Sequence, residues 1–165
     1  MRQIKFRGKD EGGKWVVGHH YSYLRDDNDK REHCILQDIS TICTDCKINY
    51  VDPETVGQFT GLLDKDGKEI YEGDITELVL PNGEVRRFVV AIETVVREVV
   101  SHPDFEAPTA WVAITGVVFK WNGYELFPCV DEDGRHDNED MQVIGNIYEH
   151  STRTQEKGKC LNEGD

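Results

Sequence analysis

The residues of this chain best suited to binding a metal are two cysteines separated by two positions. Cys43 and Cys46 form a C-x-x-C pair, and His33 and Cys34 lie upstream of it. Two thiolates at this spacing can share one tetrahedral zinc ion, which Cys34 and a histidine such as His33 could complete. A strong zinc signature has a second tight pair of ligands, and this sequence lacks one. Reduced thiols and no cofactor are therefore our prediction, and a zinc ion that staples this loop is the alternative.

Carboxylates cluster in residues 131–140, where Asp131, Glu132 and Asp133 precede Gly134. Calcium requires six to eight oxygens placed by a defined loop, and the glycine of an EF-hand loop occupies the sixth position. Gly134 comes too early for that pattern, and so does the glycine of 64–67. Both segments are therefore predicted to be turns or solvated loops.

Nothing in the sequence presents a catalytic nucleophile. His102 and Asp104 lie close together, but no serine stands in a G-x-S-x-G turn. The sequence contains no Walker A string and no G-x-G-x-x-G string for phosphate binding. These absences predict a protein that is not an enzyme.

A small set of cations and aromatic residues could form a nucleic-acid-binding face. Arg86, Arg87 and Lys120 supply the cations, and the aromatic residues are Phe119, Trp121, Tyr124 and Phe127. Aromatic rings stack on unpaired bases and cations contact phosphates. Alternation around Asn122–Gly123 explains the same aromatic residues as core, and the net charge disfavours nucleic acid as a partner.

The overall charge is strongly negative. Lys and Arg number 19 against 32 Asp and Glu, giving a net charge of −13. Such a surface repels phosphates and favours solubility and basic partners. No apolar run is long enough for a signal peptide or a membrane helix, and the five cysteines are an odd number. We therefore expect a protein of the bacterial cytoplasm, without disulfides and without membrane contact.

The spacing of turns predicts a mostly-β chain. Short runs of β-branched and aromatic residues alternate with glycine-containing turns. The predicted hairpins turn at 12–13, 64–68, 81–83 and 122–123, and the last predicted strand is 141–148. Residues 91–100 are ambiguous, although their valine content favours a strand. Segments 26–32, 101–108 and 131–140 are predicted loops, and 151–165 is a predicted flexible tail.

One short helical turn is predicted near 52–57. Asp52 can cap free backbone N–H groups, and Pro53 suits the first helical position because it has no N–H to leave unpaired. Gly57 can adopt the positive φ that ends such a turn.

The central stretch is more specific than composition. It reads VDPETVGQFTGL over 51–62 and DKDGKEIYEGDI over 64–75, and the chain begins with IKFR (4–7) and approaches its end with VIGNIYE (143–149). These strings resemble the YopX family of phage and prophage proteins over almost the whole chain up to residue 150. The residues that we take as its signature are Asp52, Pro53, Gly57, Gly61, Gly67, Tyr71, Gly73 and Asp74. Such a density of turn and core residues favours a folding role over a catalytic one.

The resemblance implies a phage or prophage origin in a bacterial host, a mainly β fold whose C-terminal half is an SH3-like barrel, and self-association. It implies no catalytic residues. The segments 26–47 and 86–110 match nothing in the family pattern and look individual to this protein.

We therefore predict one domain over 1–150, with possible sub-lobes 1–50 and 51–150, built as two small β lobes and forming a homo-oligomer. The predicted function is a non-enzymatic phage accessory protein that binds a host or phage protein. The alternative is a nucleic-acid-binding module that uses a face of the barrel.

Overall fold

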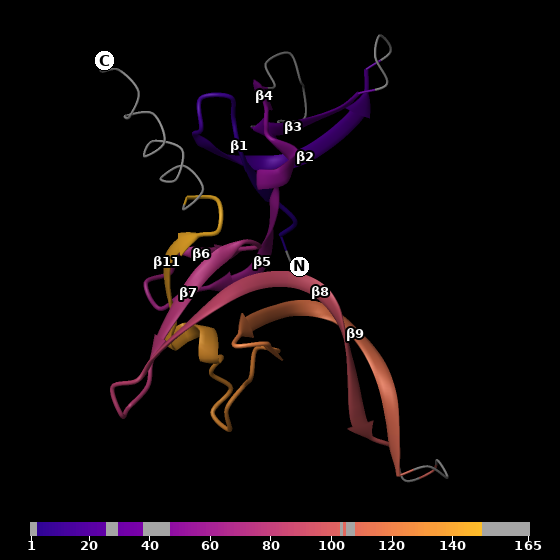
Figure 1. Cartoon of the computed structure of the whole chain (residues 1–165), viewed down its shortest axis with the longest axis vertical. Helices are drawn as coiled ribbons and strands as arrows, with labels where there is room; N and C mark the ends of the chain where they lie inside the picture. The colour runs from indigo at the N-terminus through magenta and orange to yellow at the C-terminus, as the bar shows by residue number, and fades with distance from the viewer. Residues whose placement is uncertain (1–2, 26–29, 38–46, 103, 105–107, 150–165) are drawn as a thin grey trace, which may run out of the picture.

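The computed structural model describes residues 3–25, 30–37, 47–102, 104 and 108–149. They form two antiparallel sheets that lie one beyond the other along the molecule (Figure 1). The mostly-β prediction is confirmed, because the only helical segments among the described residues are two short 3-10 turns. Within the same ranges, no helix has the length and apolar content needed to cross a membrane.

The first sheet has the strand order β4-β3-β2-β1-β5-β6. Its strands are β1 (Phe6–Lys9), β2 (Trp15–Leu24), β3 (Arg31–Gln37), β4 (Lys47–Tyr50), β5 (Gly57–Leu63) and β6 (Glu69–Tyr71). The predicted hairpin at 12–13 joins β1 to β2, with Gly13 at φ +76°. Val16, Ile35 and Val51 form the small core of this sheet, against which Val56 packs.

The predicted loop over 26–32 is wrong at its end, because β3 already begins at Arg31. Arg31 pairs with Leu24, and Glu32 pairs with Tyr23. Pairing with β2 places these charged residues in a strand, whereas β4 pairs with β3 further on, from Cys34 to Gln37. Such long-range pairing is not visible in the local charge pattern.

The predicted helical turn is the 3-10 segment η1 (Pro53–Thr55). The Asp52 carboxylate accepts the Glu54 backbone N–H at 3.0 Å, which is the predicted cap. The prediction that Gly57 ends this turn with a positive φ is wrong, since Gly57 lies in β5. A Cβ at Gly57 would stand 2.5 Å from the Glu72 carbonyl oxygen. Glycine is needed there for close backbone approach.

Substituting Gly57→Ala should therefore destabilise the fold. The added carbon meets rigid backbone, and overpacking of this kind costs about 1–3 kcal/mol. Urea denaturation followed by circular dichroism measures the change. Gly116→Ala is the matched control, because a Cβ at that strand position would meet nothing closer than 3.8 Å. Equal stabilities of the two variants would contradict the steric account.

The second sheet has the order β10-β9-β8-β7-β11. Its strands are β7 (Asp74–Val79), β8 (Val85–Val100), β9 (Thr109–Trp121), β10 (Tyr124–Leu126) and β11 (Gln142–Asn146). The predicted turns at 81–83 and 122–123 join β7 to β8 and β9 to β10, and Asn122 and Gly123 both have positive φ. The ambiguous segment 91–100 is strand. The predicted acidic loop ends in η2 (Asp137–Asp140).

The main core packs against the second sheet. It consists of Ile70, Phe88, Val90, Phe119, Met141 and Val143, with Leu62, Leu78, Val117 and Trp121 packed against it. The strand order is open at β10 and β11, so the described strands do not close, and the SH3-like barrel is not confirmed.

The chain changes sheets between β6 and β7, because β5 and β6 pair with the N-terminal strands. The domain limits, 1–150 with sub-lobes 1–50 and 51–150, stay predictions. The predicted tail 151–165 lies outside the described residues.

Candidate functional site

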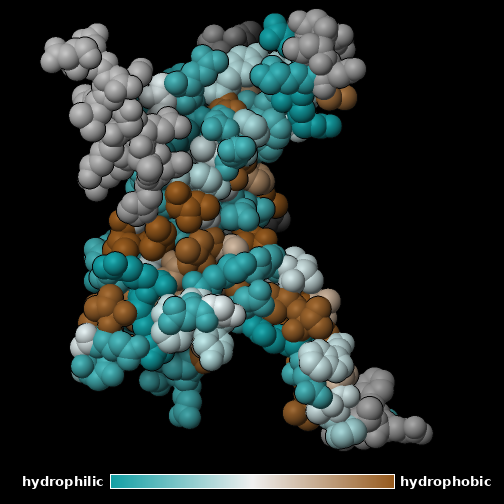
Figure 2. Space-filling view, viewed as in Figure 1, coloured by the Kyte–Doolittle hydropathy of each residue, from teal (hydrophilic) through white to brown (hydrophobic). Residues whose placement is uncertain are grey.

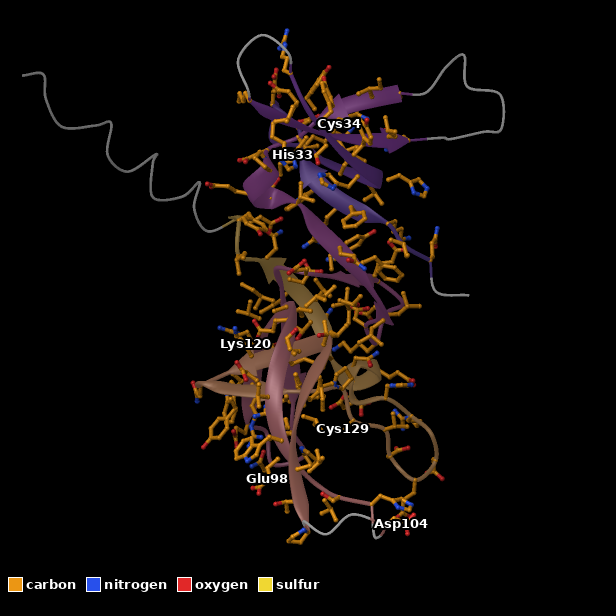
Figure 3. The ribbon with its side chains drawn as sticks, turned by 90° about the vertical axis from the view of Figure 1, so that its right-hand side faces the viewer. His33, Cys34, Glu98, Asp104, Lys120 and Cys129 are labelled. Atoms are coloured by element: carbon orange, nitrogen blue, oxygen red, sulfur yellow. The ribbon has the colours of Figure 1, made fainter. Side chains whose placement is uncertain are left out.

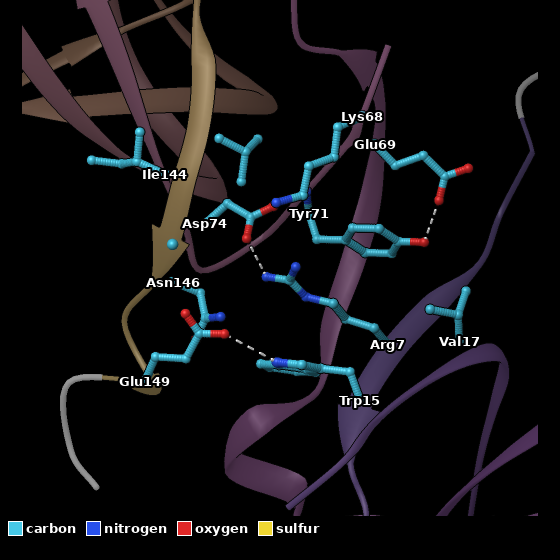
Figure 4. A pocket seen from close by; sticks show the side chains of 12 residues that line it. Arg7, Trp15, Val17, Lys68, Glu69, Tyr71, Asp74, Ile144, Asn146 and Glu149 are labelled. Atoms are coloured by element: carbon cyan, nitrogen blue, oxygen red, sulfur yellow. Dashed lines mark hydrogen bonds and ion pairs between the residues drawn. The ribbon is translucent and has the colours of Figure 1, made fainter. Parts of the chain in front are cut away.

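A cavity of about 430 Å³ lies where the two sheets meet (Figure 4). Arg7 from β1 and Trp15 from β2 enter it from the first sheet. Tyr71 ends β6 and Asp74 begins β7, so both stand at the point where the chain crosses between sheets. Three segments far apart in the sequence therefore meet here, since the end of β11 and the residues after it also line the cavity, through Asn146 and Glu149. We call this region the junction.

Arg7 is the central side chain of the junction. Its Nη2 donates to Asp74 Oδ1 at 2.5 Å, and its guanidinium carbon lies 4.6 Å from the Trp15 ring and 4.8 Å from the Tyr71 ring. Asp74 is only 1 % exposed, and its second oxygen accepts the Tyr71 backbone N–H at 2.8 Å. Burial raises the pKa of Asp74, although Arg7 opposes that shift. The Arg7–Asp74 ion pair therefore joins β1 of the first sheet to β7 of the second, with the guanidinium close to two aromatic rings.

Tyr71 extends this network of interactions along β6. Its hydroxyl donates to Glu69 Oε2 at 2.7 Å, and the Lys5 ammonium donates to the other oxygen of Glu69. Burial and the Glu69 hydrogen bond raise the pKa of Tyr71 above its ordinary value. Burial alone would raise the pKa of Glu69, but the hydrogen bonds from Lys5 and Tyr71 hold it below its ordinary value. The phenol is therefore stabilised in its neutral form.

Replacing Tyr71→Phe should lower the free energy of unfolding by about 1–2 kcal/mol at neutral pH, because one partly buried hydrogen bond to a carboxylate is lost. The folded-state pKa of Tyr71 is raised, so its contribution is complete below about pH 10, where an unfolded tyrosine ionises. That contribution is lost as the pH rises further. Urea denaturation at pH 8 and above pH 10 should show the difference between wild type and variant shrinking; a constant difference would refute this account.

The segment after β11 closes the junction. Glu149 accepts the Trp15 indole N–H at 3.4 Å, and Ile147 donates its backbone N–H to the Gly73 carbonyl at 2.9 Å. Gly73 has φ +83°, and a Cβ there would stand 3.0 Å from the Tyr148 ring. Gly73 is thus required both by its conformation and by the ring that covers it.

The second distinctive feature is a projecting two-stranded ribbon. β7 pairs with β8 only at Val85–Val89, and β10 pairs with β9 only at 119–121. Among the residues that the structure describes, 91–100 of β8 and 109–118 of β9 therefore pair only with each other, in an unbroken register. Figure 1 shows this ribbon curving away from the rest of the molecule.

One face of the ribbon carries large exposed apolar side chains. Val96, Val100 and Trp111 are 58 %, 86 % and 72 % exposed. The pairs Val96–Ala113, Glu98–Trp111 and Val100–Thr109 alternate along the strands, which places the three side chains on the same side. We call Val96, Val100 and Trp111 the ribbon face; Figure 2 shows apolar side chains along the projecting arm.

The opposite face of the ribbon is partly covered by β10. Val95 is buried there, and the Arg97 guanidinium donates to the Glu125 backbone carbonyl. The Arg97 contact holds β8 against β10, and the described residues leave Val96, Val100 and Trp111 exposed on the ribbon face.

The structure does not bring all residues of the predicted basic–aromatic face together on one surface. Arg86 lies 4.6 Å from the Trp121 ring, which stacks on Tyr124 with 6.0 Å between ring centroids. Phe119, in contrast, is buried in the main core. Each cation also has an acidic partner: Glu84 for Arg86, Glu77 for Arg87 and Glu93 for Lys120. The predicted face is thus reduced to a small stack whose charges are already paired.

Comparison with known proteins confirms the family that the sequence resembles. The family model described as "YopX protein" matches residues 5–155, nearly the whole chain. This chain belongs to the YopX family. No curated protein matches it. A similar solved structure is that of protein EF1440 from Enterococcus faecalis, at 20 % identity and a TM-score of 0.43, covering 92 % of this chain and 97 % of that one.

The signature residues of this YopX-family chain serve turns and the junction. Gly61 and Gly67 have φ of +87° and +77°, at an irregularity of β5 and in the turn before β6. Tyr71, Gly73 and Asp74 build the junction itself. Sequence reasoning missed Arg7, Trp15 and Glu149 as their partners. A sequence signal for Arg7 and Glu149 did exist. IKFR (4–7) and VIGNIYE (143–149) resemble the same family as the central stretch.

The predicted zinc ligands are only partly placed. Cys43 and Cys46 lie outside the described residues. His33 and Cys34 are neighbours in β3 and point to opposite faces of the first sheet, and Figure 3 shows both there, far from Cys129. The His33 ring stacks on His20, and burial raises the pKa of the Cys34 thiol, which disfavours a metal-binding thiolate. The zinc site stays a prediction, which metal analysis of the purified protein tests.

Proposed function

We propose that this protein is a non-enzymatic phage or prophage accessory protein that works in the bacterial cytoplasm by binding another protein, of the phage or of its host. The ribbon face is the contact surface in this proposal. The observation that supports it most is the exposure of Val96, Val100 and Trp111 on a strand pair that leaves the body of the molecule. Exposed apolar side chains that gather on one face mark interaction sites, and tryptophan is enriched among the residues that dominate binding energy. The exposed carboxylate of Glu98 lies among them, opposite Trp111.

The arrangement of the junction supports the non-enzymatic part of the proposal. Its charged groups pair with one another: Arg7 with Asp74, and Lys5 with Glu69. The Arg7–Asp74 pair joins the two sheets, and the Lys5–Glu69 pair joins the residue before β1 to β6. The buried Asp74 carboxylate thus has a cation partner without a substrate. The net charge of −13 adds a preference for a partner with a basic rim around an apolar centre.

Nucleic-acid binding is the second candidate. The stack of Arg86, Trp121 and Tyr124 favours it, because such stacks bind unpaired bases. The acidic partners of the neighbouring cations and the net charge weigh against it. Failure to bind single-stranded or duplex nucleic acid at low salt would remove this candidate.

Capture of partners from host lysate, with and without nuclease, tests the proposal. The matched variant replaces residues 98–111 by Asn-Gly, which closes a two-residue hairpin between the paired residues Arg97 and Val112. We expect a stoichiometric protein that survives nuclease and is lost with the shortened ribbon. Partners that vanish with nuclease would favour the second candidate. Retention by the shortened chain would show that the ribbon is not the contact surface.

A further inference from the structure

Strand β9 leaves part of its backbone edge unpaired. Among the described residues, 109–118 of β9 pair with β8 on one side and with no strand on the other. This stretch contains no charged residue and no proline, and its register with β8 shows no bulge. Natural proteins protect open edges by these features, and an edge that lacks them is a template for another strand.

The hydrogen bonds of the ribbon show which backbone groups of β9 are free. Ser101 donates its backbone N–H to the Pro108 carbonyl at 3.0 Å, in continuation of the β8–β9 register. In an antiparallel ladder, residue pairs that exchange hydrogen bonds alternate with pairs that do not. The even-numbered residues of β9 therefore bond to β8, and the odd-numbered ones direct their N–H and C=O groups toward the open edge. These odd-numbered residues are Thr109, Trp111, Ala113, Thr115 and Val117.

The chain itself occupies the next part of the same edge. β10 pairs with β9 at Phe119 and Trp121, which continue the odd-numbered series. β10 ends at Leu126, and Pro128 has no N–H with which to extend the pairing. The open edge over 109–117 is therefore the continuation of a site that already holds a strand.

We propose that an extended segment of the protein partner adds to β9 as a further strand, in line with β10, and pairs with the outward backbone groups of residues 109–117. In this mode of recognition, backbone hydrogen bonds supply affinity and alternate side chains supply specificity. The inference rests on the proposed function, because the added strand lies directly beside the ribbon face and its side chains contact that face.

The ribbon face determines the chemistry of this segment. Every second side chain of a strand next to β9 lies beside Trp111 and Ala113, where apolar groups gain most from burial. The exposed Glu98 lies on the same face, opposite Trp111, and Figure 3 shows it on the projecting strands. A lysine or arginine of the segment can stack on the Trp111 ring and extend toward Glu98. The net charge of −13 also favours a basic segment, and it disfavours a second copy of this chain.

Panning a displayed library of random peptides against the full chain tests the inference without knowledge of the partner. We expect enriched peptides with alternating apolar residues and with more lysine and arginine than acidic residues. Ala113→Pro removes one outward N–H and leaves the hydrogen bonds to β8 in place, since proline is tolerated where the N–H of an edge strand faces solvent. The affinity of the enriched peptides should fall at least about tenfold in this variant.

Ala113→Val is the matched control, because valine suits a strand and retains the N–H. Peptide affinity should not fall in this control, and circular dichroism verifies the fold of both variants. Equal binding of the enriched peptides by wild type and Ala113→Pro would overturn the inference, and so would a library from which no peptide is enriched.

Amide hydrogen exchange, measured by NMR, needs no substitution. In the free chain the N–H groups of Trp111, Ala113 and Thr115 should exchange faster than those of Val112 and Ile114, which bond to β8. A bound peptide should slow the three outward amides at least about tenfold. Unchanged exchange in the saturated complex would overturn strand addition. Slowing of the same amides as the concentration of the chain alone rises would identify a second copy as the occupant and also overturn it.

Capture from lysate separates this inference from the proposed function. A partner that is lost with the shortened ribbon but retained by Ala113→Pro refutes strand addition and keeps the ribbon as the contact surface. A partner that the shortened chain retains refutes the proposed contact surface, even where library peptides still pair with β9.

Discussion

Replacing Arg7 with methionine should lower the free energy of unfolding by about 3–5 kcal/mol at pH 7. Methionine retains apolar contact with the Trp15 and Tyr71 rings but leaves the Asp74 carboxylate, only 1 % exposed, without its cation. The cost of an uncompensated buried charge far exceeds the value of most surface ion pairs. Urea denaturation followed by tryptophan fluorescence measures the loss.

The pH dependence of this loss identifies its cause. Burial already raises the pKa of Asp74 in the presence of Arg7, and removing the guanidinium raises it further. A carboxyl group with a raised folded-state pKa destabilises the fold as the pH rises from its unfolded value, about 3.9, through its folded value. The deficit of Arg7→Met should therefore be largest at pH 7 and shrink toward pH 4–5.

The double variant Arg7→Met with Asp74→Asn is the control for a chain that fails to fold. It removes the buried charge and should regain a large part of the lost stability, whereas Asp74→Asn alone leaves Arg7 unpaired and should be destabilising. Additive effects of the two substitutions, or a deficit independent of pH, would mean that the ion pair does not hold the junction.

Replacing Trp111 with alanine should weaken capture of the protein partner by about thirtyfold while leaving the fold intact. Truncation of a central aromatic contact costs about 2 kcal/mol or more of binding free energy. Trp111 is 72 % exposed, so the free energy of unfolding should change by no more than about 0.5 kcal/mol. Titration of the purified partner against both proteins gives the affinities.

Tyr21→Ala serves as the matched control for this substitution. Tyr21 is an exposed aromatic residue of β2, in the other sheet, and its truncation should not change the affinity. Equal affinities of wild type and Trp111→Ala would exclude the ribbon face as the contact. A loss with both variants would indicate a general effect of exposed aromatic residues.

Local chemistry was sufficient to predict the hairpins. Asn122–Gly123 and the turn before Lys68 require positive φ, and such requirements are visible in single residues. The start of β3 was missed because its charged residues are held in a strand by pairing with β2. The closure of a barrel was expected from resemblance to the family. Gly57 shows the same limit, since its small size is required by the Glu72 carbonyl, fifteen positions away in the sequence.

The candidate site was less predictable than the fold. Tyr71, Gly73 and Asp74 could be selected from one contiguous string, but their partner Arg7 is 67 positions from Asp74 and has no local sign of burial. The ribbon was harder still. Valine-rich residues 91–100 suggested a strand, yet only the pairing of β7 and β10 shows where that strand leaves the sheet.

Because β8 continues without a break from the main core into the ribbon, we expect the ribbon to behave as a stiff extension of the core. The strand that bears Val100 at its far end is the one whose Phe88 and Val90 lie in the main core, and no break in register separates the two ends. A force that displaces Val100 is therefore transmitted through the β8–β9 hydrogen bonds to the main core at Phe119 and Met141, because no break in register provides a hinge. In the proposed function, a partner that bends the ribbon would therefore strain the main core to which β8 belongs.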